Sequence, residues 1–114
     1  MTLLLSISTD GLEPEVSRPA PEKVIAGDPV HRTWNCEDDG DGLYAGVWES
    51  TPGEWRVAYA EWEYCEILSG VSVLTDEAGE SRRYVAGDAF AIRRGFQGTW
   101  RVEETTRKRY VIKL

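Results

Sequence analysis

The sequence predicts an all-β protein, a sandwich or a barrel, with little helix. Turn signals such as Thr51-Pro52-Gly53 and Ala86-Gly87-Asp88 recur roughly every 8–17 residues in the second half of the chain. The short runs between these turns are rich in Trp, Tyr, Val, Ile and Thr, which favour strands. No segment carries a sustained apolar stripe at the helical period. Together these observations favour an antiparallel fold.

Size and composition narrow the class of protein further. A chain of 114 residues, 41% apolar and 29% charged, has room for one domain with one packed core. Its formal charge of −7 has the wrong sign for nucleic acid or an anionic membrane, so we expect neither as a partner. Two cysteines are too few for a disulfide framework, and the apolar start at residues 1–7 is too short for a signal peptide or a membrane span. We therefore expect a cytoplasmic protein.

Residues 1–42 are predicted to form an N-terminal arm, together with a first edge strand, as part of the same domain. Four of the five prolines lie here, and because proline lacks a backbone N–H, this segment should run extended over the surface. Residues 23–26 can form the short edge strand. The acidic residues 37–42 are predicted to form a solvated turn, because they lack the glutamate that completes a calcium-binding loop.

Residues 43–114 are predicted to form the barrel itself. The first plausible strand covers residues 43–50, directly after the acidic turn. Further strands are predicted at residues 55–59, 64–68, 71–75, 89–92, 99–102 and 109–114.

Four blocks of residues in this half carry a family resemblance. They are EYCEILSG at 63–70, AGDAF at 86–90, RGFQGTW at 94–100 and RKRY at 107–110. The first block looks like the end of the first cupin motif, and the next two look like the second motif. The chain resembles the small single-domain cupins of the DUF861, or Cupin_3, group in the RmlC-like superfamily. That resemblance implies a jelly-roll antiparallel β-barrel, in a superfamily that hosts many unrelated functions.

Metal-binding cupins take two histidines and a glutamate from the first motif and a third histidine from the second. The resemblance places the glutamate at Glu63. The histidine positions of the first motif fall on Val57 and Tyr59 or, at the other allowed spacing, on Arg56 and Ala58, and that of the second falls on Gly98. The single histidine, His31, lies in the N-terminal arm. We therefore predict no bound catalytic metal and no other cofactor.

Strand alternation indicates which side chains face the barrel interior. Trp55, Val57 and Tyr59 share one face of their strand and are large and apolar, so that face should point inward. Trp100 should face inward as well, and it could fill space that a ligand needs.

The resemblance places Glu63 inward, and the last strand supplies a charged partner for it. Lys108 shares a face with Tyr110 and Ile112, so its apolar company places it inward too. A buried glutamate and a buried lysine are each costly alone, but an ion pair would satisfy both.

These inward residues form the predicted site. The candidate ligand-binding residues are Trp55, Tyr59, Glu63, Arg93, Trp100 and Lys108. Arg93 is included because it would lie at the barrel mouth, where it could hold an anion. A catalytic role is open, with Glu63, Lys108 and Tyr59 as the best candidates. Plain core packing of the aromatic residues and a structural ion pair are the alternatives.

Three functions fit this pattern. The first is a cupin that binds a small polar metabolite without a metal. The second is a metal-independent lyase, isomerase or hydrolase, with Glu63 as general base and Tyr59 or Lys108 as acid or electrostatic stabiliser. The third is a dimeric scaffold with a filled barrel. For each we expect a homodimer, because an extended arm and open strand edges offer backbone groups that a second copy can pair.

Overall fold

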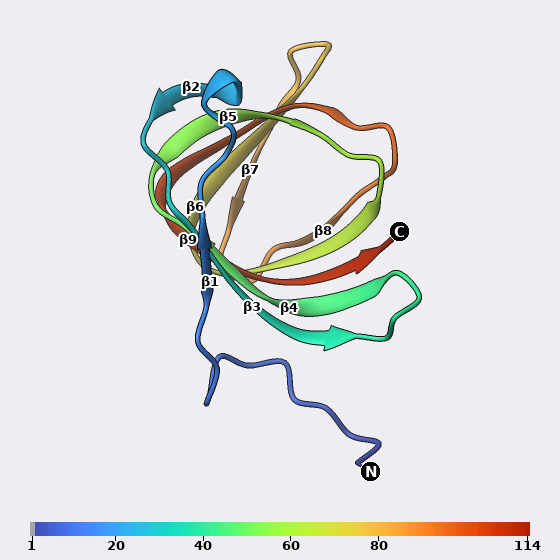
Figure 1. The fold of residues 1–114 in the computed structure, drawn as a ribbon. Coiled ribbons are helices and arrows are strands. Elements are labelled where there is room, and N and C mark those ends of the chain that lie inside the picture. The colour runs from blue at the N-terminus through green and yellow to red at the C-terminus, as the bar shows by residue number, and fades with distance from the viewer. Residues whose placement is uncertain (1) are drawn as a thin grey trace.

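The computed structural model describes residues 2–114, so Met1 at the start of the predicted N-terminal arm lies outside it. A single antiparallel sheet curls round into a barrel (Figure 1). The strands are β1 (Glu15–Ser17), β2 (Val24–Gly27), β3 (His31–Asp38), β4 (Leu43–Ser50), β5 (Gly53–Ala58), β6 (Trp62–Asp76), β7 (Ser81–Val85), β8 (Ala89–Ile92) and β9 (Gln97–Lys113). One short 3-10 turn, η1 (Pro21–Lys23), is the helical element of the described residues. The predicted all-β class is confirmed.

Two long strands, β6 and β9, hold the barrel together. They pair with each other along most of their length, with Ile67 opposite Lys108 and Leu74 opposite Trp100. The first part of β9 also pairs with β5, and its last part pairs with β4. The sequence predicts two strands in each of these regions, residues 64–68 and 71–75 in one and residues 99–102 and 109–114 in the other. In the structure each pair of predicted strands is one continuous strand.

The inward faces predicted from strand alternation are confirmed. In β5, Trp55 is buried and the next residue, Arg56, is exposed. In β9, Lys108 is buried and Arg109 is exposed, and Glu63 of β6 is buried as well. Because β6 and β9 are neighbours, the buried charges of both strands face the same interior.

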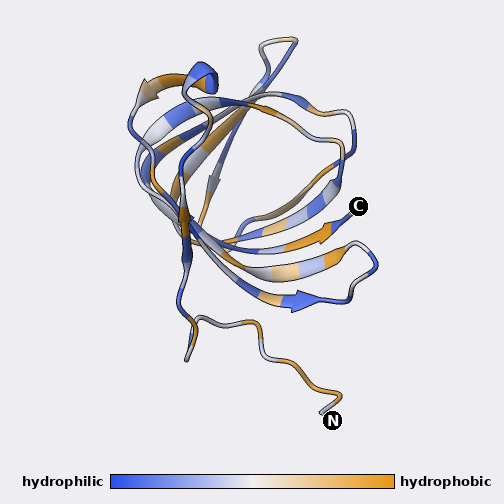
Figure 2. Ribbon diagram, in the orientation of Figure 1, coloured by the Kyte–Doolittle hydropathy of each residue, from blue (hydrophilic) through white to orange (hydrophobic). Residues whose placement is uncertain are grey.

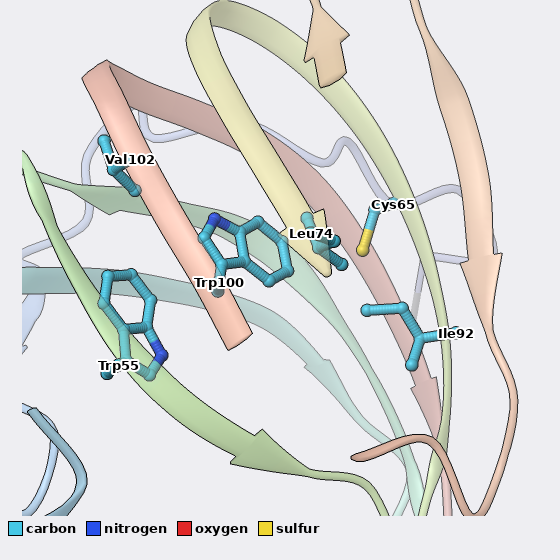
Figure 3. Close-up of a cluster of buried hydrophobic side chains, with 6 residues drawn as sticks. All are labelled: Trp55, Cys65, Leu74, Ile92, Trp100 and Val102. Atoms are coloured by element: carbon cyan, nitrogen blue, oxygen red, sulfur yellow. The ribbon is translucent and has the colours of Figure 1, made fainter. Parts of the chain in front are cut away.

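A cluster of buried apolar side chains forms the core of the barrel. Its members are Trp55, Cys65, Leu74, Ile92, Trp100 and Val102 (Figure 3). The indoles of Trp55 and Trp100 are nearly parallel, with 5° between their planes and 6.4 Å between ring centroids. Burying a large side chain of this kind stabilises the fold by about 1.5–3 kcal/mol.

The first 42 residues contain more regular structure than the sequence predicts. The predicted edge strand is present as β2, which pairs with β5. The sequence pattern missed β3, a strand of eight residues that lies between β1 and β4. The inward residues of β3 are His31, Thr33 and Asn35, which line a pocket. Their polar character hides the apolar alternation by which a strand is usually found.

The leading segment, residues 2–14, runs away from the barrel (Figure 1). Leu3 and Leu4 are 91% and 88% exposed, and the segment contains some of the most apolar residues of the chain (Figure 2). One contact with β3 is a hydrogen bond of 3.3 Å from the Cys36 thiol to the Ser8 carbonyl oxygen. Within the described residues, no helix has the length and apolar character needed to cross a membrane.

Candidate functional site

A pocket of about 490 Å³ lies inside the barrel, and we call it the barrel pocket. Side chains from β1, β3, β4, β5, β6 and β9 line it. The pocket brings together five of the six candidate ligand-binding residues, namely Trp55, Tyr59, Glu63, Trp100 and Lys108. Four of these side chains come from β5, β6 and β9 and point inward by alternation along their strands, and Tyr59 directly follows the end of β5. Trp100, only 1% exposed, packs into the core and leaves the pocket beside it.

The structure does not bring Arg93 to the barrel pocket. Arg93 is exposed and borders a second hollow of about 640 Å³, lined mainly by residues of β6, β7 and β8. It directly follows Ile92, which is buried at the end of β8. Alternation therefore turns the arginine away from the interior that Ile92 faces.

The predicted ion pair between Glu63 and Lys108 is present. The Lys108 Nζ lies 2.7 Å from Glu63 Oε2, and both side chains are only 5% exposed. Burial alone would lower the pKa of Lys108, but the acidic groups of Cys65 and Glu63 beside it outweigh that effect, and the pKa is raised. Lys108 is therefore a permanent buried cation at neutral pH.

Aromatic rings and a thiol complete the surroundings of this cation. The Lys108 Nζ lies 4.6 Å from the ring centroid of Trp48 and 4.3 Å from that of Trp100. It also donates a hydrogen bond of 3.7 Å to the sulfur of Cys65. Indole faces attract cations, so these contacts add to the carboxylate in offsetting the cost of removing the ammonium from water.

Tyr59 and Cys65 are both held in their neutral forms. Burial raises the pKa of Tyr59, an effect that Lys108 opposes and Glu63 reinforces. Burial likewise raises the pKa of Cys65 to about 12. At neutral pH the Tyr59 hydroxyl can thus donate a hydrogen bond, whereas the Cys65 thiol is a poor nucleophile.

His31 is part of the barrel pocket, although the sequence placed it in the N-terminal arm and away from the cupin motifs. Its ring centroid lies 5.1 Å from that of Trp48 and 4.7 Å from that of Trp55. Burial, and next the charge of Lys108, lower its pKa from 6.5 to about 4. The signal that could have located it is the spacing of His31, Thr33 and Asn35 at the strand period, which puts three polar side chains on one face.

The candidate set also left out three aromatic residues of the pocket wall, namely Tyr44, Trp48 and Tyr110. Trp48 faces inward from β4, where it pairs with Thr33 on one side and with Lys108 on the other. Tyr110 donates a hydrogen bond of 2.7 Å from its hydroxyl to Asn35 Oδ1. Burial raises the pKa of Tyr110 to about 12, so this donor is neutral as well.

The residues present do not fit the transition-metal site of metal-binding cupins. Glu63 is already bonded to an ammonium at 2.7 Å. At Gly98, where the second motif carries its histidine, an added Cβ would collide with the backbone carbonyl oxygen of Thr75. Nowhere in residues 2–114 do three His, Cys, Asp or Glu side chains gather as candidate ligands.

A curled antiparallel barrel with polar groups among the aromatic side chains of its pocket is the architecture of a cupin. The family model for the EutQ-like cupin domain, Cupin_3, matches residues 37–110. The chain belongs to this family, as the four sequence blocks predicted.

Solved structures agree with the fold. A protein of unknown function from the DUF861 family of Pseudomonas syringae superposes with a TM-score of 0.83 at 29% identity, over 94% of this chain and 46% of that one. EutQ from Clostridium difficile superposes with a TM-score of 0.68 at 17% identity, over 75% of this chain and 63% of that one. A predicted oxalate decarboxylase from Thermotoga maritima superposes with a TM-score of 0.71 at 16% identity, over 96% of this chain and 98% of that one. The chain thus spans about half the length of the first protein. No curated protein matches significantly.

Proposed function

We propose that this chain is a cupin that binds a small polar metabolite and works without a catalytic transition metal. The buried Lys108–Glu63 pair on the wall of the barrel pocket carries this proposal. The ammonium supplies, next to Glu63, the positive charge that a metal supplies in metal-binding cupins. Such an arrangement preserves a polar interior without histidine ligands. The two free cysteines support our prediction of a cytoplasmic location.

The size and lining of the pocket favour ligand binding over a filled scaffold barrel. Small-molecule pockets usually enclose about 300–1,000 Å³ and combine aromatic walls with a few polar groups. The barrel pocket, at about 490 Å³, offers indoles together with the polar groups of Tyr59 and Lys108. A barrel with a purely structural role would gain stability if side chains filled this space.

A metal-independent enzyme is the second candidate, and the observation that favours it is Tyr59. Its hydroxyl stays protonated on the pocket wall, where it can donate a hydrogen bond to negative charge that develops on a substrate. The other candidate, Glu63, is already paired with the Lys108 ammonium at 2.7 Å and is therefore not free to take a proton from a substrate. Binding without turnover is therefore the better-supported function.

A thermal-shift screen against a broad metabolite library tests the proposal. We expect at least one organic ligand to stabilise the protein, by about 2.7 kcal/mol at a concentration one hundred times its Kd. The stabilisation should be lost in Lys108→Met. It should persist in the matched control Arg109→Met, which changes the next residue of β9 on the exposed face.

Elemental analysis of untagged protein covers the metal part of the proposal. We expect no stoichiometric transition metal. A Mn, Fe, Ni or Zn content near one per chain that disappears in Glu63→Ala would contradict metal-free binding. If no library member stabilises the protein, the scaffold function replaces the binding function.

A further inference from the structure

His31 presents its two ring nitrogens to different surroundings. Nε2 is buried and has no hydrogen-bond partner among the described residues, in a ring that lies against the indoles of Trp48 and Trp55. The electron-rich faces of such indoles tolerate an N–H and repel a lone pair. The hydrogen of the neutral imidazole therefore belongs on Nε2, and the lone pair belongs on Nδ1. Because His31 lines the barrel pocket, Nδ1 is the nitrogen left as a hydrogen-bond acceptor for a ligand.

The two buried charges of the pocket wall balance each other. Lys108 is paired with Glu63, and a pKa of about 4 leaves His31 neutral at physiological pH. The remaining ionised residue of the lining is the exposed Glu15 of β1. An anionic ligand would thus lose water without meeting an unpaired positive charge. A cationic ligand would find the indole faces of Trp48 and Trp100 already occupied by the Lys108 ammonium.

The remaining wall combines flat apolar surfaces with neutral polar groups. Tyr44 and Trp48 are half-buried aromatic residues that line the pocket. Thr33 and the Tyr59 hydroxyl supply polar groups, and His31 supplies an acceptor. A ring-shaped molecule can lay an apolar face on such aromatic surfaces and direct hydroxyl or N–H groups to the polar ones.

We infer that His31 is the ligand-selecting contact of the barrel pocket, and that the ligand is an uncharged ring compound with a hydroxyl or N–H donor directed at Nδ1. The inference rests on the proposed binding function and names the class of its ligand. Sugars and nucleosides are two sources of this chemistry. Neither requires a charged partner in the protein.

The single histidine of the chain makes a direct test possible. Protein labelled with ¹⁵N-histidine gives one imidazole spin system, whose nitrogen shifts report the tautomer. We expect the Nε2–H tautomer in the free protein. Three probe panels are then added: uncharged monosaccharides and nucleosides, small carboxylates and phosphate esters, and small amines. We expect a member of the first panel to shift the Nδ1 resonance. Testing monosaccharides and nucleosides separately then shows which of the two kinds of compound binds.

Variants measure the energetic role of His31. His31→Phe keeps the ring and its packing but removes both nitrogens, so affinity for the bound probe should fall about tenfold. Arg32→Gln, a change of the neighbouring residue on β3 that pairs with Glu49, is the matched control and should leave affinity unchanged. Unchanged affinity in His31→Phe would overturn the inference.

Three other results would also overturn the inference: an Nδ1–H tautomer in the free protein, binding by the charged panels alone, or no binding by any panel. The tautomer is measured on the unmodified protein, so this test does not depend on the folding of a variant. A library metabolite that needs Lys108 but ignores His31 would refute the inference and leave the proposed function in place. Absence of any ligand in the broad screen would refute the proposed function itself.

Discussion

Lys108 and Glu63 show how a barrel interior can hold two charges with almost no solvent. Each side chain alone would carry an uncompensated buried charge, whereas at 2.7 Å each satisfies the other. The carboxylate, the thiol of Cys65 and two indole faces surround the ammonium on several sides. The stability of this site therefore depends on the two charges being present together.

The first prediction concerns the coupling of this pair. Glu63→Gln and Lys108→Met should each lower the free energy of unfolding by about 3–5 kcal/mol, because each leaves one buried charge unpaired. The double variant should lose less than the sum of the two single losses. Urea unfolding of all four proteins measures the coupling energy, and a value below about 0.5 kcal/mol would mean that the two sites are independent.

The second prediction concerns pH and His31. Its pKa is lowered from 6.5 to about 4, so the unfolded chain takes up a proton at a higher pH than the folded protein does. This contribution to stability is complete above pH 6.5 and is lost as the pH falls toward about 4. Because solvent screens the partly exposed ring, we expect the free energy of unfolding to fall by only on the order of 1 kcal/mol over this range. Urea unfolding from pH 7.5 to 4 should show a weaker pH dependence in His31→Phe. An identical dependence in both proteins would contradict the lowered pKa.

At the scale of single elements, Gly98 marks where β9 passes close to β6. It pairs with Asp76 of β6 and with Val57 of β5. A Cβ at this position would meet the carbonyl oxygen of Thr75, which is part of a strand and has little freedom to move. Close strand contact, rather than a turn, is what requires glycine here.

The third prediction is that Gly98→Ala destabilises the protein by about 2–3 kcal/mol, because the strands must separate to admit the methyl group. Gly79→Ala is a suitable control. Gly79 has a φ of +85°, which is unfavourable for alanine, but an added Cβ there meets no atom within 4 Å. The control should lose only about 1 kcal/mol. Thermal or urea unfolding compares the two, and equal losses would show that steric contact with Thr75 is unimportant.

Strand alternation allowed much of the fold and site to be predicted from the sequence. The predicted strand at residues 43–50 has the same limits as β4. The inward direction of Glu63 and Lys108 agrees with the same alternation. The spacing of His31, Thr33 and Asn35 indicates that they share a strand face, but it does not place that face in the barrel, because this depends on the pairing of β3 with β4. Arg93 is near the second motif in sequence, but it follows the buried Ile92 at the end of β8, so nearness to the motif does not bring its side chain to the pocket.

At the scale of the whole molecule, the leading segment remains without a partner for its leucines. Leu3, Leu4 and Leu5 are 91%, 88% and 52% exposed. The short strand β1 pairs with β3 and has no neighbour among the described residues on its other edge. Exposed apolar side chains beside an open strand edge favour association with another chain.

The fourth prediction is a homodimer in which these features contact a second copy. Light scattering at tens of micromolar should give a mass of about twice the 12.8 kDa of one chain. Leu3→Asp combined with Leu4→Asp should weaken the dimer, because charges would replace the apolar contact. Tyr64→Phe, a change on the exposed face of β6, is the control. A monomer at this concentration would contradict the proposed dimer.

The central position of β9 has a consequence for how the protein is made. β4 pairs with β3 and β5 pairs with β2, and both of these partners come earlier in the chain. The second neighbour of β4 and of β5 is β9. During synthesis, one edge of β4 and one edge of β5 therefore stay unpaired until residues 97–113 have left the ribosome. The barrel should then close only after translation of β9, on the slow timescale of milliseconds to seconds typical of distant strand pairing. Until that moment the growing chain exposes its apolar strands to chaperones and to other nascent chains.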